Sequence, residues 1–122
     1  MNQSEFIRSL LDWIEDNLGH DLHLDEVARR SGYSRWHLQR LFRQHTGFSL
    51  AEYIRQRRLT ESALTLINSD EAILQVAMSY GFDTQQAYTR TFKNYFSVTP
   101  GQLRRQRRVE QERLLFPLAV AS

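Results

Sequence analysis

The sequence repeats one segment at an interval of about fifty residues. Val27–Ser34 returns as Val76–Asp83, and Arg40–Arg43 returns as Arg90–Lys93, so the offset grows from 49 to 50 within the segment. An internal repeat identifies the structural unit of a chain before any other feature does. Each copy carries an apolar helical pattern, a glycine and a second helical pattern. The unit is therefore a helix, a glycine turn and a second helix.

Size and composition exclude several classes of protein. The 122 residues are enough for one or two small domains, but not for a large enzyme core. The chain has no cysteine, which rules out disulfides, thiolate zinc sites and cysteine nucleophiles. No apolar run approaches the roughly 18 residues of a membrane span, and the N-terminus lacks a signal-peptide pattern. We expect a cytoplasmic protein with no membrane partner and no cofactor.

Positive charge is concentrated in the repeated segments, although the net charge is only +2. Residues 1–26 carry one arginine against seven acids, whereas residues 27–58 carry eight arginines against one glutamate. Residues 59–83 carry four acids and no lysine or arginine, and residues 84–122 carry seven bases against two acids. All but one of the basic residues are arginines, whose planar fork suits phosphates and guanine edges. This pattern predicts two basic surfaces for an anionic partner.

The apolar periodicity predicts an all-α fold with about seven helices and no strands. A helix of about 18 residues after Ser49 would span roughly 27 Å and separate the two copies of the repeat. The expected organisation is an N-terminal helix-turn-helix subdomain over residues 1–48, a linker helix over 49–67, a C-terminal helix-turn-helix subdomain over 68–108 and a tail over 109–122. The tail contains an apolar stretch with no periodic partner.

Capping residues predict where several helices begin. Ser4 is expected to cap the first helix, which is expected to end near Gly19, and Asn68–Asp70 to cap the first helix of the second subdomain. Thr99 is expected to cap the last helix, where Pro100 at the first position and Gln102 at the third complete a capping box.

The second helix of each copy is expected to expose a polar face. In the first copy Leu38, Leu41 and Phe42 form the inward stripe. The outward residues of that copy are Arg35, Trp36, Gln39, Arg40 and Arg43. The outward residues of the second copy are Gln85, Gln86, Thr89, Arg90 and Lys93. Guanidinium forks, amides and an apolar ring are suited to contacting base edges, so we predict double-stranded DNA as the partner.

One chain supplies both recognition helices, which indicates binding as a monomer. Most helix-turn-helix proteins dimerise to place two such helices about 34 Å apart on DNA. The linker helix and the modules that it joins can set that separation within one subunit. Because the two outward sets differ in sequence, we expect two different half-sites in successive major grooves, and hence an asymmetric DNA element.

The two copies also resemble a known family. Gly32–Phe42 and Tyr80–Lys93 are similar to the DNA-binding domain of the AraC/XylS transcription activators, and most similar to the stand-alone MarA/SoxS/Rob-like subgroup. Leu11–Asn17 strengthens the resemblance, which extends to about Arg108. It implies a bacterial, nucleoid-associated activator that recruits RNA polymerase to stress and multidrug-resistance genes. Most members also carry an effector domain, for which 122 residues leave no room, so we expect control through the amount of protein.

The resemblance implies a role for each candidate residue. One major groove would be read by Trp36, Gln39 and Arg40, and the other by Gln85, Gln86, Thr89 and Arg90. The DNA backbone would be contacted by Arg30, Arg35 and Lys93. The surface offered to polymerase would include Trp13 and Asp16.

The sequence departs from the family pattern at three positions. His23 stands where a serine cap is common, Ala87 where a threonine is common, and Leu103 where an aromatic residue is usual. Ala87 lacks a hydroxyl for a hydrogen bond to a base, although its methyl group could meet a thymine methyl.

Three other functions are compatible with parts of the sequence. The first is a repressor or architectural DNA-binding protein that uses the same fold without polymerase. The second is an enzyme, whose only candidate bases or ligands are His20, His23, His37 and His45. These histidines have neither metal-ligand spacing nor a nucleophile motif beside them, so we expect no enzyme. The third is a helical adaptor that binds only proteins, for which any DNA affinity would depend little on salt.

Overall fold

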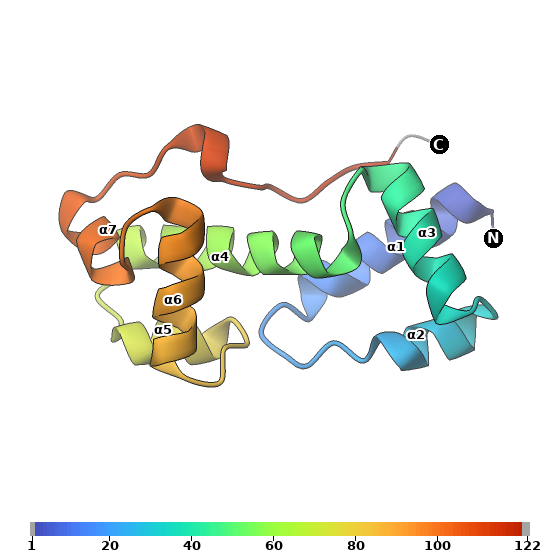
Figure 1. Cartoon of the computed structure of the whole chain (residues 1–122), viewed down its shortest axis with the longest axis horizontal. Coiled ribbons are helices and arrows are strands. Elements are labelled where there is room, and N and C mark those ends of the chain that lie inside the picture. Colours follow the sequence, from blue (N-terminus) through green and yellow to red (C-terminus); the bar gives the residue numbers. More distant parts are fainter. Residues whose placement is uncertain (1, 121–122) are drawn as a thin grey trace. The chain divides into compact units, whose positions relative to one another are not determined.

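The computed structural model of the chain describes residues 2–120. Over these residues it contains seven α-helices, one short 3₁₀ helix and no strand (Figure 1). The predicted all-α fold, with two helix-turn-helix subdomains and a long helix between them, is confirmed. By contacts the chain divides into two units. The first comprises the chain up to Arg55 and from Pro117 onward, and the second is Gln56–Phe116.

The first unit is built from three helices and the beginning of a fourth. These are α1 (Gln3–Asp16), α2 (Leu24–Ser31), α3 (Arg35–Thr46) and the first residues of α4 (Leu50–Asn68). Its buried apolar residues include the inward stripe predicted for α3. They are Ile7, Leu10, Leu11, Ile14, Leu18, Ala28, Leu38, Leu41, Phe42, Leu50, Tyr53 and Ile54. Burial of these side chains is the main contribution that holds α1 and α3 in place.

A tight turn at Gly32 joins α2 to α3. Gly32 has a φ of 82°, in the left-handed region that glycine adopts without a steric penalty. Its N–H donates to the Ala28 carbonyl at 3.1 Å, which closes the end of α2. The Ser34 hydroxyl then accepts from the His37 N–H at 3.1 Å and caps α3.

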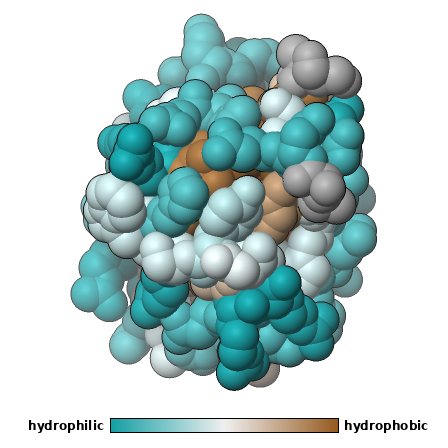
Figure 2. Space-filling view, turned by 90° about the vertical axis from the view of Figure 1, so that its right-hand side faces the viewer, coloured by the Kyte–Doolittle hydropathy of each residue, from teal (hydrophilic) through white to brown (hydrophobic). Residues whose placement is uncertain are grey.

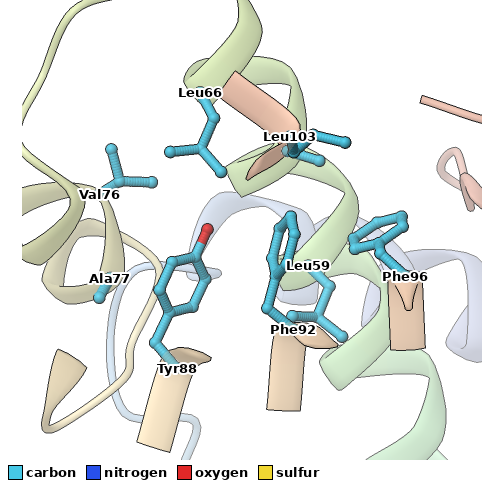
Figure 3. Close-up of a cluster of buried hydrophobic side chains, with 9 residues drawn as sticks. Leu59, Leu66, Val76, Ala77, Tyr88, Phe92, Phe96 and Leu103 are labelled. Carbon is cyan, nitrogen blue, oxygen red and sulfur yellow. The ribbon is translucent and has the colours of Figure 1, made fainter. Parts of the chain in front are cut away.

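The second unit contains the remainder of α4 and three further helices. These are α5 (Ile73–Ser79), α6 (Gln85–Phe96) and α7 (Pro100–Gln106), followed by the 3₁₀ helix η1 (Gln111–Arg113). Figure 3 shows Tyr88, Phe92 and Phe96 of α6 packed among side chains of α4, α5 and α7. Burial raises the pKa of the Tyr88 hydroxyl above its usual range, so this side chain packs as a neutral group.

The second turn also contains a left-handed glycine, but Tyr80 lies between this glycine and the end of α5. Gly81 has a φ of 85°, and a Cβ at this position would lie 3.0 Å from the guanidinium carbon of Arg58. The Thr84 hydroxyl accepts from the Ala87 N–H at 3.0 Å and caps α6. At α7, both hydrogen bonds of the predicted capping box between Thr99 and Gln102 are present.

Two predicted helix starts and one predicted end are wrong. Asn2, rather than Ser4, caps α1, because its Oδ1 accepts from the Glu5 N–H at 2.8 Å. The same helix ends at Asp16 instead of near Gly19. In the second unit α5 begins only at Ile73, after a residue with no capping side chain. Ser69 instead donates its hydroxyl to a carbonyl of α4, so it completes the preceding helix.

The apolar tail, which has no periodic partner in the sequence, packs along the second unit. Leu114 lies against the buried cluster of that unit. The Leu115 N–H donates to the Thr60 hydroxyl of α4 at 2.9 Å, and the Leu115 carbonyl accepts from the buried guanidinium of Arg57. Figure 1 shows this segment beside α4. Residues 109–116 therefore form part of the fold of the second unit.

A second pair of hydrogen bonds attaches the tail to α6. The Tyr95 hydroxyl donates to the Arg113 carbonyl, and the Arg113 guanidinium donates back to the Tyr95 carbonyl at 2.7 Å. Tyr95 lies in the last turn of α6, where helix carbonyls lack partners within the helix. The tail thus supplies a hydrogen-bond donor to a carbonyl at the C-terminal end of this helix.

We predict that Thr60→Val destabilises the protein while preserving the shape of the side chain. The Leu115 N–H would lose its acceptor, which costs about 1–3 kcal/mol when the group is buried. Urea denaturation followed by circular dichroism measures this free energy of unfolding. Thr91→Val on α6 is the matched control, because Thr91 is half-buried and makes no hydrogen bond through its side chain within residues 2–120. Equal stability of the two variants would contradict a stabilising hydrogen bond between the Leu115 N–H and the Thr60 hydroxyl.

Candidate nucleic-acid interface

Helix α3 separates its apolar and polar residues onto opposite sides. Leu38, Leu41 and Phe42 are at most 2 % exposed. The predicted outward residues are all exposed: Arg35, Trp36, Gln39, Arg40 and Arg43. Figure 2 shows the side of the molecule on which α2 and α3 are drawn in Figure 1, and hydrophilic residues cover most of it. The helix therefore presents guanidinium, amide and indole groups to solvent together.

Trp36 and Arg40 contact each other on this face. The Arg40 guanidinium carbon lies 5.2 Å from the centre of the Trp36 ring, within the range of a cation–π interaction. Trp36 is 69 % exposed, which is unusual for so large an apolar side chain. The stacking restrains the arginine and leaves its fork free to donate two hydrogen bonds to a base edge.

Tilted and edge-to-face aromatic contacts hold the start of α3 against α1. The rings of Phe6 and Tyr33 are 5.1 Å apart, and those of Tyr33 and His37 are 4.9 Å apart. Such contacts add to the burial of area and restrict how a helix can rotate. The beginning of α3 is therefore held to the rest of the first unit by ring contacts as well as by the turn.

Two arginines assigned to the DNA backbone by resemblance already have carboxylate partners. Arg35 Nε lies 3.0 Å from Asp25 Oδ1, and Arg30 Nη2 lies 2.8 Å from Glu26 Oε1. The sequence does not single out these carboxylates as part of the interface. The spacing of Glu26 and Arg30 is that of an i, i+4 helical pair, so this partner could have been found. No spacing rule indicates the pairing of Asp25 with Arg35, because the turn lies between them.

Helix α6 brings its five candidate residues to one groove. The shallow groove is lined by Gln85, Gln86, Thr89, Arg90 and Lys93. Thr89 is half-buried and the other four are exposed. Two amides, a hydroxyl and two cations thus line one surface, with a composition different from that of α3.

Trp13 and Asp16 occupy different surroundings on α1. Trp13 is half-buried and lines an apolar groove that also includes Phe6, Val27 and Arg30. Asp16 is exposed and lies outside this groove. The residue assigned to polymerase and one residue assigned to the DNA backbone therefore border the same groove of the first unit.

Within residues 2–120, no three histidine or acidic side chains are grouped closely enough to hold a metal ion. None of the helices there has the length and apolar character needed to cross a bilayer.

Two helix-turn-helix corners, each followed by an exposed basic helix face, define a protein of the double helix-turn-helix class. A family model described as a helix-turn-helix domain matches residues 27–106. The multiple antibiotic resistance protein MarA of Escherichia coli K12 is 54 % identical over 112 residues, which cover 92 % of this chain and 88 % of that relative. The chain belongs to the AraC/XylS family, in its MarA/SoxS/Rob-like subgroup, and is a DNA-binding transcriptional regulator.

Solved structures show the same fold. The C-terminal domain of AraT, a response regulator from Geobacillus stearothermophilus, matches with a TM-score of 0.80 at 28 % identity, over 91 % of this chain and 93 % of that domain. The DNA-binding domain of AdpA, solved in complex with a target DNA, matches with a TM-score of 0.76 at 23 % identity, over 82 % of this chain and 90 % of that one.

We predict that Arg40→Ala and Arg90→Ala each weaken specific DNA binding by about 1–3 kcal/mol. Each variant loses discrimination only in the half-site that its own helix reads. Fluorescence anisotropy with duplexes altered in one half at a time measures both effects. Arg29→Ala is the control, because Arg29 is an exposed arginine of α2 outside the candidate faces. If one variant lost base discrimination in both half-sites, the prediction that each helix reads only one half-site would be contradicted.

Proposed function

We propose that the protein binds as a monomer to an asymmetric promoter element, with α3 and α6 in successive major grooves. The observation that carries this proposal is the difference between the two exposed faces. The α3 face combines a stacked Trp36–Arg40 pair with Gln39, whereas the α6 face offers Gln85, Gln86 and Arg90. Two faces of different chemistry recognise different base sequences, so the element has a direction.

The proposed contacts fall into two groups. Base edges are read by Trp36, Gln39, Arg40, Gln85, Gln86, Thr89 and Arg90. The DNA backbone is contacted by Arg30, Arg35 and Lys93, and Arg43 adds a further basic contact from α3. Backbone contacts set the position of the protein on the duplex, and base contacts set its sequence preference.

We further propose that the protein activates transcription by recruiting RNA polymerase to stress and multidrug-resistance genes, on nucleoid DNA of the bacterial cytoplasm. The relationship to MarA, a multiple antibiotic resistance protein, supports this. A contact surface is available on α1, where Trp13 borders an apolar groove and Asp16 provides an exposed carboxylate. Tryptophan is among the residues that most often anchor protein interfaces.

We predict that Trp13→Ala combined with Asp16→Ala lowers transcription by about tenfold or more, the size expected for loss of an interface anchor. In vitro transcription with purified polymerase measures this effect. Unchanged affinity for the promoter element shows that the variant is folded. The matched control is Asp12→Ala, because Asp12 is an exposed acid of α1 outside the proposed surface.

Unchanged transcription by the double variant would reject the polymerase surface. It would favour a repressor or architectural protein with the same fold. Asp16→Ala alone separates the contribution of the exposed carboxylate from that of the half-buried indole.

A further inference from the structure

The first unit contains carboxylates that occupy its phosphate-binding arginines. Asp25 and Glu26 are neighbours in the first turn of α2. Asp25 pairs with Arg35 at the start of α3, at 3.0 Å, and Glu26 pairs with Arg30 one turn along α2, at 2.8 Å. Both arginines are assigned to the DNA backbone in the proposed function. The two ion pairs therefore lie where phosphates are expected to bind.

The arginines assigned to base edges are not paired in this way. Arg40 stacks on Trp36, and neither Arg40 nor Arg90 makes an ion pair within residues 2–120. Within residues 2–120, Asp25 and Glu26 thus pair with the arginines proposed to contact phosphates. They do not pair with the arginines proposed to contact bases.

Stability of the fold does not explain the pair that crosses the turn. The Arg35 and Asp25 side chains are 62 % and 76 % exposed, and exposed ion pairs contribute little to stability. Acidic residues in the first turn of a helix interact favourably with its dipole. That effect accounts for acids at these positions, but not for the contact of Asp25 with an arginine of another helix.

Phosphate and carboxylate compete for the same guanidinium donors. Both anions accept hydrogen bonds from the arginine fork. For Arg35 to bind DNA, the Asp25 carboxylate has to give up its hydrogen bond and then stays close to a phosphate of the same charge. This penalty is the same for every DNA sequence, because phosphates carry no sequence information.

We propose that Asp25 and Glu26 are internal competitors that weaken DNA binding uniformly across sequences. They raise the protein concentration that is needed to occupy a promoter element, without changing which bases are preferred. This inference rests on the proposed backbone contacts of Arg30 and Arg35. In a regulator controlled through its amount, such a penalty sets the threshold for occupancy.

The test uses the full chain with Asp25→Asn, Glu26→Gln and the double variant. Asp12→Asn is the control, because it makes the same change of charge at an exposed position of α1 that has no ion pair within residues 2–120. Affinity is measured by anisotropy for the promoter element and for a random duplex, over a series of salt concentrations. Thermal unfolding followed by circular dichroism confirms that the variants are folded.

We expect each substitution to tighten binding by about two- to fivefold, the factor that corresponds to releasing an exposed ion pair. The element and the random duplex should gain by the same factor, so their ratio of affinities stays unchanged. The log–log dependence on salt should become steeper by up to about 0.9 for each arginine released. A gain no larger than that of Asp12→Asn, or a loss of affinity, would overturn the proposal.

A double-mutant cycle with Arg35→Ala separates competition from a general effect of charge. The gain from Asp25→Asn should disappear when Arg35 is absent, and a gain that persists would overturn the proposal. Arg35→Ala alone tests the proposed backbone contact. If it leaves DNA affinity unchanged, the backbone contact itself fails. If it weakens binding while Asp25→Asn matches the control, only the competition fails.

Discussion

The recognition faces depend on the burial of the opposite sides of the same helices. In α6 Tyr88, Phe92 and Phe96 lie in the core of the second unit, and in α3 Leu38 and Phe42 are buried in the first. Successive residues of an α-helix are about 100° apart around its axis, so burying one side determines which residues face outward. Rotating α3 by one residue would carry Arg40 or Arg43 into the core, where an unpaired charge is strongly unfavourable. Apolar packing therefore determines which side chains DNA can meet.

Local features of the fold were predictable because each depends on a few adjacent residues. Both turns follow from glycines that adopt positive φ, and the capping box of α7 follows from Thr99 and Gln102. The start of α1 was missed because Asn2 and Ser4 are both good capping residues, and only the structure shows which one accepts the hydrogen bond.

Long-range polar contacts were not predictable from periodicity. The N–H of Leu115 and the hydroxyl of Thr60 are 55 residues apart in the chain, and a backbone donor leaves no pattern in the sequence. The ion pair of Asp25 with Arg35 joins two helices across a turn, so the i, i+4 spacing rule for a single helix does not predict it. The candidate base-contacting residues were easier to find, because each lies opposite an apolar stripe.

The arginines proposed to contact the DNA backbone from the first unit also differ in ion pairing from the basic residues of α6. Arg30 and Arg35 have carboxylate partners, whereas Arg90 and Lys93 make no ion pair within residues 2–120. In the proposed function one chain thus combines two faces that differ in side-chain chemistry and in ion pairing, as a heterodimer would. The proposed asymmetric DNA element fits this difference between the two faces.

The most direct test of this account is the stoichiometry of the complex on its promoter element. Sedimentation equilibrium with a labelled duplex counts the chains bound at saturation. The account predicts one chain per element, and a loss of affinity when one half of the element is inverted. Two chains per element, with binding that tolerates the inversion, would contradict it.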